Sequence, residues 1–333
     1  MEKVLEIRGL HTHFELEEGT VTAVNGVDLD VYRGRTLGIV GESGCGKSVT
    51  AQSIMRIVPS PPGRIVSGEI RLFRKEGVID LAAYSNNSKE LRSVRGSEIS
   101  MVFQEPMTSL SPVHTVGAQI IEVIRLHQGL DKQAARKRAI EMLKVVGIPR
   151  AELVVDSYPH QLSGGMRQRA MIARALSCEP KILIADEPTT ALDVTVQAQI
   201  LKVLADLRND FGMALILITH NLGVIAQVAD YVAVFYLGII VEEGPVDRIF
   251  ARPLHPYTAA LFASIPRIET EGRLSPIRGS VPDPFATVTG CPFRDRCERS
   301  FGRCESGEVP PAYEVESGHK ARCFLYEHAG SEP

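Results

Sequence analysis

The sequence lacks an apolar run long enough to cross a membrane. Its longest one, YVAVFYLGIIV at 231–241, is well short of the roughly 18 to 20 residues that a membrane-spanning helix needs. The N-terminal segment also lacks the positive, apolar and small-residue regions of a secretory signal. We therefore expect a protein that stays in the cytosol and reaches a membrane only through a partner.

A strong charge of either sign is missing as well. The 333 residues include 37 basic and 40 acidic ones, which gives a formal net charge of -3. This balance gives no indication of a broad nucleic-acid-binding surface or of a disordered chain. The length allows two domains, or one large domain with an appendage.

Cysteine is scarce, with six in the chain, but three of them fall within CPFRDRCERSFGRC at 291–304. A cytosolic location keeps thiols reduced, which makes disulfides a poor explanation for this cluster. Metal binding and buried packing remain as explanations.

Apolar patterns predict an α/β fold with a mainly parallel sheet. Residues 1–40 contain three short strand patterns, which predict a β-rich N-terminal subdomain. Further buried strands are predicted at 99–103, 181–185 and 214–219, each leading into polar residues. An apolar helical stripe lies between the last two. Strands that alternate with helices predict ligands at the carboxyl ends of a parallel sheet.

Composition divides the chain near residue 250. Residues 1–250 are predicted to form one domain, in which about 105–175 is a mainly helical subdomain. Proline and glycine become frequent after residue 250. Residues 251–333 are therefore predicted to be a C-terminal extension with a linker and one short helix.

The segment GESGCGKS at 41–48 fits the phosphate-loop pattern. It follows a predicted strand and opens a predicted helix, so a chance match is the weaker explanation. Glycines let successive N–H groups point at phosphate oxygens, and the helix presents its positive end to them. Lys47 would neutralise the β- and γ-phosphates, and Ser48 would ligate magnesium. The residues expected to bind nucleotide in this segment are Gly41, Ser43, Gly44, Gly46, Lys47, Ser48 and Val49.

A second acidic site follows the apolar strand in KILIADEP at 181–188. Asp186 can hold magnesium through water, and Glu187 can activate an attacking water as a general base. The alternative is a capping pair for the next helix. The strand favours the first interpretation, because it would end at the same sheet edge as the phosphate loop.

Between these sites stands QLSGGMRQRAMIARAL at 161–176, and with it the sequence resembles the ATP-binding subunits of ATP-binding cassette (ABC) transporters. The LSGG at 162–165 matches the signature of that family. Gln104 in VFQEP, TALD at 190–193 and His220 in LITHN also occur in the expected order. The matches span residues 1 to about 245 and imply an ABC-type P-loop ATPase domain over residues 1–250.

The resemblance implies roles for residues outside the two motifs. Phe14 would stack on adenine, and His220 would contact the γ-phosphate. Gln104 would sense magnesium and the attacking water, and Asp193 would organise the dimer contact. Three residues at a helix start would grip the ATP of the other subunit with their N–H groups and the helix dipole: Ser163, Gly164 and Gly165. A chain with one nucleotide module therefore implies a dimer, with a second copy or with a homologue.

Two positions depart from the commonest pattern of the family. Met166 follows LSGG where glutamine is usual, and Asn221 follows His220 where aspartate is usual. Neither change removes a phosphate donor or the predicted base, so catalysis by Glu187 is still expected.

Past the ATPase core, HPYTAALFASIP at 255–266 and GCPFRDRC at 290–297 resemble the C-terminal region of oligopeptide and dipeptide import ATPases. This implies an ATP-hydrolysing subunit that powers import of di- and oligopeptides from the cytoplasmic face of the membrane. The implied partners are a homologous ATPase subunit in a heterodimer, two transmembrane permease subunits and, indirectly, an extracytoplasmic peptide-binding protein. Nucleic acid is not an expected partner.

Other functions remain as alternatives. An importer ATPase for nickel, glutathione or a sugar-like solute would have the same core. A soluble ABC ATPase of DNA repair would have a long coiled coil between the phosphate loop and the signature, and no sustained heptads occur there. A ribosome-associated factor would carry two nucleotide modules in one chain. A regulator that binds ATP without turnover would not need Glu187.

Four cysteines of the C-terminal extension offer enough thiolates for tetrahedral zinc or for an iron–sulfur cluster: Cys291, Cys297, Cys304 and Cys323. Their spacing lacks the tight pair of most zinc sites, and unligated packing is a third explanation. The resemblance implies a four-iron (4Fe-4S) cluster, because members of the peptide-import subfamily with this pattern carry one. Zinc is kept as the alternative. His319 is either a substitute ligand or a surface histidine.

Overall fold

The computed structural model describes residues 1–104, 109–190, 192–264, 277–286 and 289–328. The chain divides into two compact units, each made of several segments. Unit 1 comprises Met1–Leu5, Val31–Thr36 and Leu72–Ile218, and unit 2 comprises Glu6–Asp30, Leu37–Arg71 and Thr219–Pro333. The domain boundary predicted at residue 250 stays a prediction.

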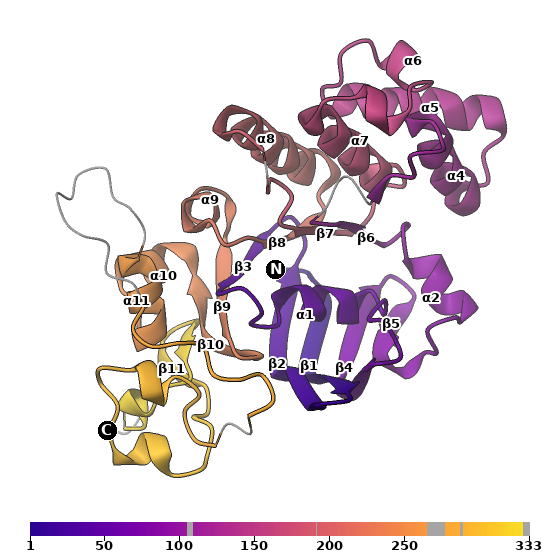
Figure 1. Ribbon diagram of the computed structural model, residues 1–333. Helices are drawn as coiled ribbons and strands as arrows, with labels where there is room; N and C mark the ends of the chain where they lie inside the picture. Colours follow the sequence, from indigo (N-terminus) through magenta and orange to yellow (C-terminus); the bar gives the residue numbers. More distant parts are fainter. Residues whose placement is uncertain (105–108, 191, 265–276, 287–288, 329–333) are drawn as a thin grey trace. The chain divides into compact units, whose positions relative to one another are not determined.

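The β-rich N-terminal region consists of β1 (Lys3–Leu16), β2 (Gly19–Tyr32) and β4 (Gly63–Arg74). These strands lie side by side in the order β2-β1-β4 (Figure 1). Apolar residues of β1 and β2 are fully buried, among them Ile7 and Val24. Burial of one face of each strand is what the alternating apolar pattern predicts.

The other strands of unit 2 are ordered β11-β12-β10-β9-β3. The bounds of these strands are β3 (Thr36–Gly41), β9 (Tyr231–Tyr236), β10 (Ile239–Pro245), β11 (Tyr313–Glu316) and β12 (His319–Ala321). β3 pairs parallel with β9, whereas β10 pairs antiparallel with both β9 and β12. The hairpin of β11 and β12 therefore extends the sheet at the edge of β10.

Unit 1 contains β6 (Ile99–Val102), β7 (Ile182–Asp186) and β8 (Ala214–Ile218), and also the short β5 (Gly77–Asp80). β7 pairs parallel with both β6 and β8. Every residue of these three strands is buried. The predicted buried strands of this region and their parallel arrangement are confirmed.

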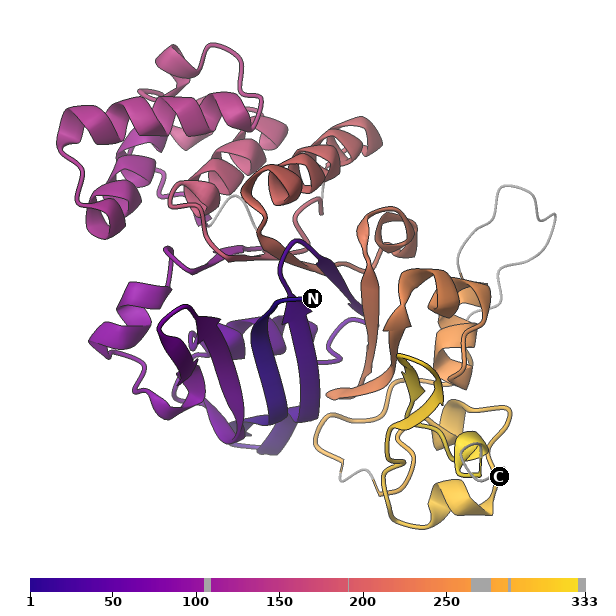
Figure 2. The same ribbon diagram turned by 180° about the vertical axis from the view of Figure 1, so that it is seen from behind.

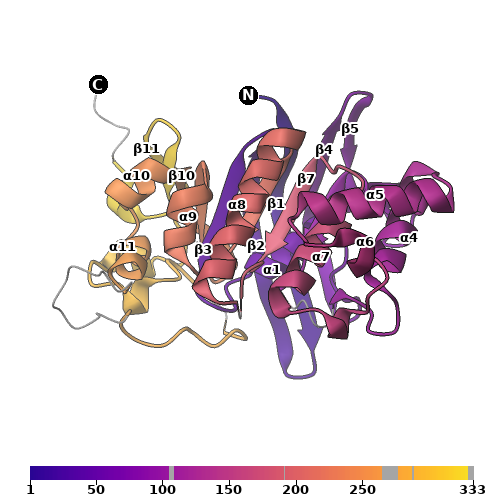
Figure 3. The same cartoon turned by 90° about the horizontal axis from the view of Figure 1, so that it is seen from above.

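The helices of unit 1 are α2 (Lys89–Val94), α4 (Val116–Gln128), α5 (Lys132–Val145), α6 (Ala151–Val154), α7 (Gly164–Leu176) and α8 (Val194–Phe211). Figures 2 and 3 show α4, α5, α6 and α7 gathered into one helical group. In α5 one face is buried, at Ala135, Ala139, Met142 and Leu143. The helical subdomain is confirmed for the described residues.

The helices of unit 2 are α1 (Lys47–Ile54), α9 (Leu222–Val228), α10 (Val246–Ala251) and α11 (Pro256–Ala263). The α11 helix is the short helix predicted after residue 250. Single 3-10 turns occupy Leu81–Ala83, Pro159–Gln161, Arg294–Arg296, Gly302–Glu305 and Phe324–Tyr326. Among the described residues, none of the helices combines the length and the apolar character that crossing a membrane requires.

Candidate functional site

The phosphate loop connects β3 to α1, so the predicted strand, loop and helix are in place. Gly46 has a φ of 100°, and a Cβ atom built on it would collide with the carbonyl oxygen of Ala23. A Cβ atom on Gly41 would collide with the carbonyl oxygen of Phe235. Glycine is required at both positions, because the backbone of the loop passes against neighbouring backbone.

Lys47 opens α1 and is 6% exposed. Its Nζ atom donates to the carbonyl oxygens of Gly41 at 2.9 Å and of Glu42 at 2.8 Å. The ammonium group is thereby fixed over the loop. Ser43 and Gly44 at the loop tip are exposed, and Ser48 and Val49 are half-buried in the first turn of the helix.

These residues fit a nucleoside triphosphate with bound magnesium. The first turn of α1 holds no acidic residue, so the positive end of the helix is not cancelled. Loop N–H groups and Lys47 supply donors and positive charge for phosphate oxygens, and Ser48 supplies a hydroxyl oxygen of the kind that magnesium prefers. A bound magnesium ion would neutralise phosphate charge at this site.

The buried thiol of Cys45 lies within the same loop. Burial raises the pKa of the Cys45 thiol. The nearby ammonium group of Lys47 opposes this shift, with 3.6 Å between Lys47 Nζ and Cys45 Sγ. Cys178 is half-buried and its pKa is also raised by burial. Both thiols therefore stay protonated near neutral pH, as expected of packing residues.

The acidic site lies in unit 1, where Asp186 ends β7. The next residue, Glu187, has a φ of 46° and its N–H donates to the carbonyl oxygen of Ile218 at 2.9 Å. Its Oε2 atom accepts hydrogen bonds from Gln104 Nε2 at 3.2 Å and from Thr190 Oγ1 at 2.8 Å. Gln104 and Glu187 are 83 positions apart in the sequence, and the structure brings them together.

Asp193, and not the acidic pair, caps the helix that follows. Its side chain accepts a hydrogen bond from the N–H of Val196 at 2.9 Å, at the start of α8. The capping alternative for Asp186 and Glu187 is therefore wrong. Asp193 is exposed, and its predicted role in a dimer contact stays a prediction.

The signature segment starts α7. Ser163 is the N-cap residue, and its Oγ atom accepts a hydrogen bond from the N–H of Met166 at 3.3 Å. Gly164 is exposed. A Cβ atom built on Gly165 would come within 2.8 Å of Val196 Cγ1. A methionine in place of the usual glutamine leaves this cap intact, because the cap uses only its backbone.

The remaining predicted residues lie in unit 2. His220 is exposed, and Asn221 caps α9 by accepting a hydrogen bond from the N–H of Val224 at 3.3 Å. Asparagine thus supplies the same oxygen cap as aspartate. Phe14 is half-buried near the end of β1, and its stacking on adenine stays a prediction.

The prediction of an iron–sulfur cluster is wrong. In the part of the chain that the structure describes, which includes all four cysteines, no group of three or more His, Cys, Asp or Glu side chains is placed to hold a metal ion. The zinc alternative fails for the same reason. Burial raises the pKa of Cys291 to about 12 and that of Cys323 to about 11. These thiols pack in their protonated form.

His319 is neither a ligand nor a surface residue. It is 1% exposed, and its Nε2 atom lies 2.8 Å from Oε1 of Glu242, which is also buried. The Glu242 carboxylate accepts two more hydrogen bonds, from the N–H groups of Leu254 and His255 at 2.9 and 2.8 Å. This carboxylate connects β10, β12 and the start of α11. These hydrogen bonds, and not a metal ion, help to fix the C-terminal extension.

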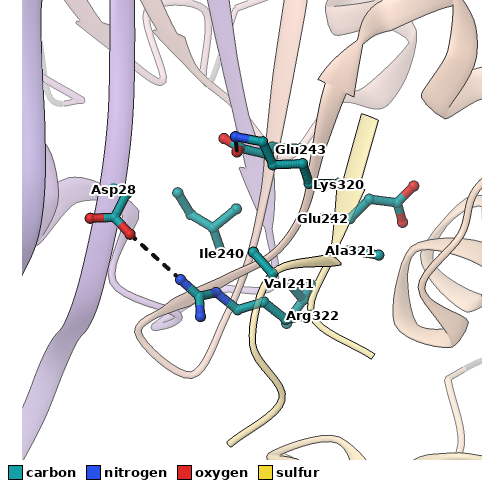
Figure 4. Close-up of a pocket in the computed structure, with 9 residues that line it drawn as sticks. Asp28, Ile240, Val241, Glu242, Glu243, Lys320, Ala321 and Arg322 are labelled. Atoms are coloured by element: carbon teal, nitrogen blue, oxygen red, sulfur yellow. Dashed lines mark hydrogen bonds and ion pairs between the residues drawn. The ribbon is translucent and has the colours of Figure 1, made fainter. Parts of the chain in front are cut away.

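Figure 4 shows the hollow beside the strand pair β10 and β12. Arg322 on its rim reaches toward Asp28, with 3.7 Å between Nη2 and Oδ2, and Lys320 pairs with Glu243 at 3.0 Å. Its volume is about 80 Å³, enough for a few water molecules. The hollow is too small for a nucleotide or a peptide.

Three residues near the phosphate loop were not predicted as part of the site. Glu42 belongs to the loop, and Tyr257 and Arg296 of the C-terminal region both hydrogen-bond to it. The segments that contain Tyr257 and Arg296 were recognised by their resemblance to peptide import ATPases, but nothing in the sequence indicates that they reach the phosphate loop.

Two family models match the chain. One, described as ABC transporter, matches residues 24–190, and the other, described as oligopeptide/dipeptide transporter, C-terminal region, matches residues 241–304. The chain is 49% identical to the oligopeptide transport ATP-binding protein AppD of Bacillus subtilis (strain 168), over 100% of this chain and 99% of the relative. It is 50% identical to the dipeptide transport ATP-binding protein DppD of the same organism, over 98% and 95%.

Solved structures agree with these relatives. The dimeric structure of MJ0796, a bacterial ABC transporter cassette, matches with a TM-score of 0.63 and 27% identity, over 73% of this chain and 98% of that one. CbiO1 from Clostridium perfringens, part of the ABC transporter complex cbiONQ, matches with a TM-score of 0.61 and 29% identity, over 76% and 92%. The chain therefore belongs to the ABC transporter family, among the oligopeptide and dipeptide transport ATP-binding proteins.

Proposed function

We propose that this chain is the ATP-hydrolysing subunit that powers import of di- and oligopeptides through a membrane ABC transporter. The observation that carries this proposal is the likeness to peptide transport ATP-binding proteins along the whole chain, which includes the C-terminal region at 241–304. ATPase activity follows from the family. The peptide substrate is supported by the C-terminal region.

In the proposed reaction, water attacks the γ-phosphate of ATP, and ADP and phosphate leave. Lys47 binds the phosphates, while Ser48, Gln104 and Asp186 are the proposed contacts to magnesium. Glu187 accepts the proton of the attacking water. The hydrogen bonds from Gln104 and Thr190 hold its carboxylate in one orientation, which supports this role.

The proposed site is shared between two ATPase subunits. The chain has one phosphate loop and one LSGG segment, and the related cassette MJ0796 is a dimer. Ser163, Gly164 and Gly165 would then bind the ATP of the partner, and His220 would contact the γ-phosphate. We infer that the partner is a homologous ATPase, and that the pair sits on two permease subunits at the cytoplasmic face of the membrane.

The test of this function is Glu187→Gln in the complex with the permease subunits. Removal of a general base is expected to lower ATP turnover by about a hundredfold or more, while ATP still binds. Glu141→Gln serves as the control, because Glu141 is a half-exposed residue of α5. Turnover is measured as phosphate release, and transport as uptake of labelled dipeptide into proteoliposomes.

Two results would contradict the proposal in different ways. Near wild-type turnover of Glu187→Gln would remove the base from the mechanism. Stimulation of ATP turnover by nickel or glutathione but not by peptide would leave the ATPase standing and replace the peptide as substrate.

A further inference from the structure

The C-terminal region contacts the phosphate loop at Glu42. The Glu42 carboxylate accepts two hydrogen bonds from the guanidinium of Arg296, with 2.7 Å between Nη1 and Oε2 and 3.0 Å between Nη2 and Oε1. The Arg296 side chain is 5% exposed and the Glu42 side chain 24%. A two-point pair of this kind fixes orientation as well as distance.

A second contact reaches the backbone of the same residue. The N–H of Glu42 donates to the hydroxyl oxygen of Tyr257 at 2.9 Å. Tyr257 belongs to α11, and its ring lies among Tyr236 and Phe293, with ring centroids 4.7 and 5.4 Å away. Burial raises the pKa of the Tyr257 hydroxyl far above its ordinary value, so the group stays neutral.

Arg296 is held in place independently of Glu42. Its Nε atom donates to the carbonyl oxygen of Arg278 at 2.9 Å, and Nη1 lies 3.4 Å from the hydroxyl oxygen of Tyr236. Its guanidinium carbon is 5.8 Å from the ring centroids of both Tyr236 and Phe293. The arginine is therefore preorganised to receive the Glu42 carboxylate.

These contacts bear on Lys47 and on the charge of the loop. The carbonyl oxygen of Glu42 accepts a hydrogen bond from Lys47 Nζ, so the N–H, the side chain and the carbonyl of Glu42 are all fixed. An unpaired carboxylate at the second position of a phosphate loop would repel a triphosphate. Arg296 neutralises that carboxylate, and a low local dielectric makes the neutralisation matter.

We infer that Arg296 and Tyr257 are positioning residues for ATP binding. They hold Glu42, whose carbonyl oxygen accepts a hydrogen bond from Lys47 Nζ, in the loop conformation that binds phosphate. The C-terminal region is thereby part of the ATP site. The inference rests on the proposed function, since it concerns the same site.

The test compares ATP affinity in Arg296→Met, Glu42→Gln and the double variant of the full chain. Arg296→Met leaves the carboxylate uncompensated, and we expect ATP to bind about tenfold more weakly. The double variant removes both charges and should bind within about threefold of wild type. Affinity is measured with a fluorescent ATP analogue, and thermal denaturation reports folding.

The matched control is Arg278→Met. Arg278 lies in the same region and pairs with Glu298 at the surface, with side chains 78% and 67% exposed. Its carbonyl oxygen still accepts the hydrogen bond from Arg296, so affinity should not change. In the assembled complex, Arg296→Met should raise the KM for ATP and change kcat by less than about twofold, as loss of uniform binding predicts.

Tyr257→Phe decides the question if Arg296→Met does not fold. It removes one oxygen and keeps the ring, and ATP affinity should fall about threefold. Wild-type affinity in a folded Arg296→Met or in Tyr257→Phe would overturn the inference, as would a double variant as weak as Arg296→Met. A wild-type chain that does not bind ATP would instead overturn the proposed function.

Discussion

The phosphate loop and the cysteine segment at 291–304 are both marked in the sequence by a repeated residue type, and they differ in what that repetition means. The loop glycines let backbone groups of adjacent residues surround one site, and the structure shows why Gly41 and Gly46 must be glycine. Within the described part of the chain, the cysteines form no metal site. The segment instead contacts the phosphate loop through Arg296, which lies between Cys291 and Cys297.

Motifs therefore differ in how far the sequence alone supports them. A motif made of adjacent residues carries its own geometry, because few backbone conformations connect them. A set of side chains that are separated in the sequence becomes a binding site only if the fold brings them together with their donor atoms available to a ligand. In the C-terminal region the fold buries three of the four thiols, those of Cys291, Cys304 and Cys323, and places Arg296 and Tyr257 on the phosphate loop.

A substitution at Gly46 of the phosphate loop should destabilise the protein most. Gly46→Ala places a methyl group against the carbonyl of Ala23 at a φ of 100°. Strain and overpacking together should lower the free energy of unfolding by about 4 kcal/mol, and ATP binding should be lost. Urea denaturation and nucleotide titration measure the two effects.

Gly44→Ala is the control within the same loop. Gly44 also has a positive φ, 78°, but a Cβ atom built on it meets nothing within 4 Å. Only the backbone preference is affected, at a cost of about 1 kcal/mol. Equal losses of stability in Gly44→Ala and Gly46→Ala would show that close backbone packing is not the reason for glycine at position 46.

The next effect concerns the C-terminal region and pH. His255 caps α11 through Nδ1, and burial lowers its pKa from 6.5 to about 4, although Glu242 opposes this. Between pH 6.5 and pH 4 the unfolded chain binds a proton that the folded chain does not. The stability is therefore complete above pH 6.5 and falls by about 3 kcal/mol as the pH drops to 4.

His255→Asn isolates this contribution. Asparagine can still cap the helix with its side-chain oxygen, but it does not titrate. The free energy of unfolding is measured against pH for both chains, and the advantage of the wild type at pH 7 should shrink toward pH 4. Parallel curves would show that His255 is not the group responsible.

A substitution at a cysteine of the C-terminal region should have little effect on stability. Cys297 is half-buried, and Cys297→Ser should change the free energy of unfolding by less than about 1 kcal/mol. A metal chelator should leave the melting temperature of the wild type unchanged, because the described residues offer no metal site. A melting temperature that falls when the chelator is added would contradict this prediction and show that the C-terminal extension binds a metal ion.

Much of the ATPase core was predictable because its signals are local. The apolar runs predicted β6, β7 and β8, and the phosphate loop was recognised from eight adjacent residues, 41–48. The hairpin of β11 and β12 was not predicted. Its second strand has only three residues, His319–Ala321, too few to show a period of two. Pairing with β10, rather than its own pattern, makes it a strand.

The ATP motifs can be identified from the sequence alone, because adjacent residues and buried strands encode them through backbone geometry and apolar periodicity. The contact between the C-terminal region and the phosphate loop exists only in the folded chain. Glu42 and Arg296 are 254 positions apart, and a charged pair at that separation leaves no local pattern. The same holds for Glu242 and His319, since burial turns ordinary polar residues into partners that must satisfy each other.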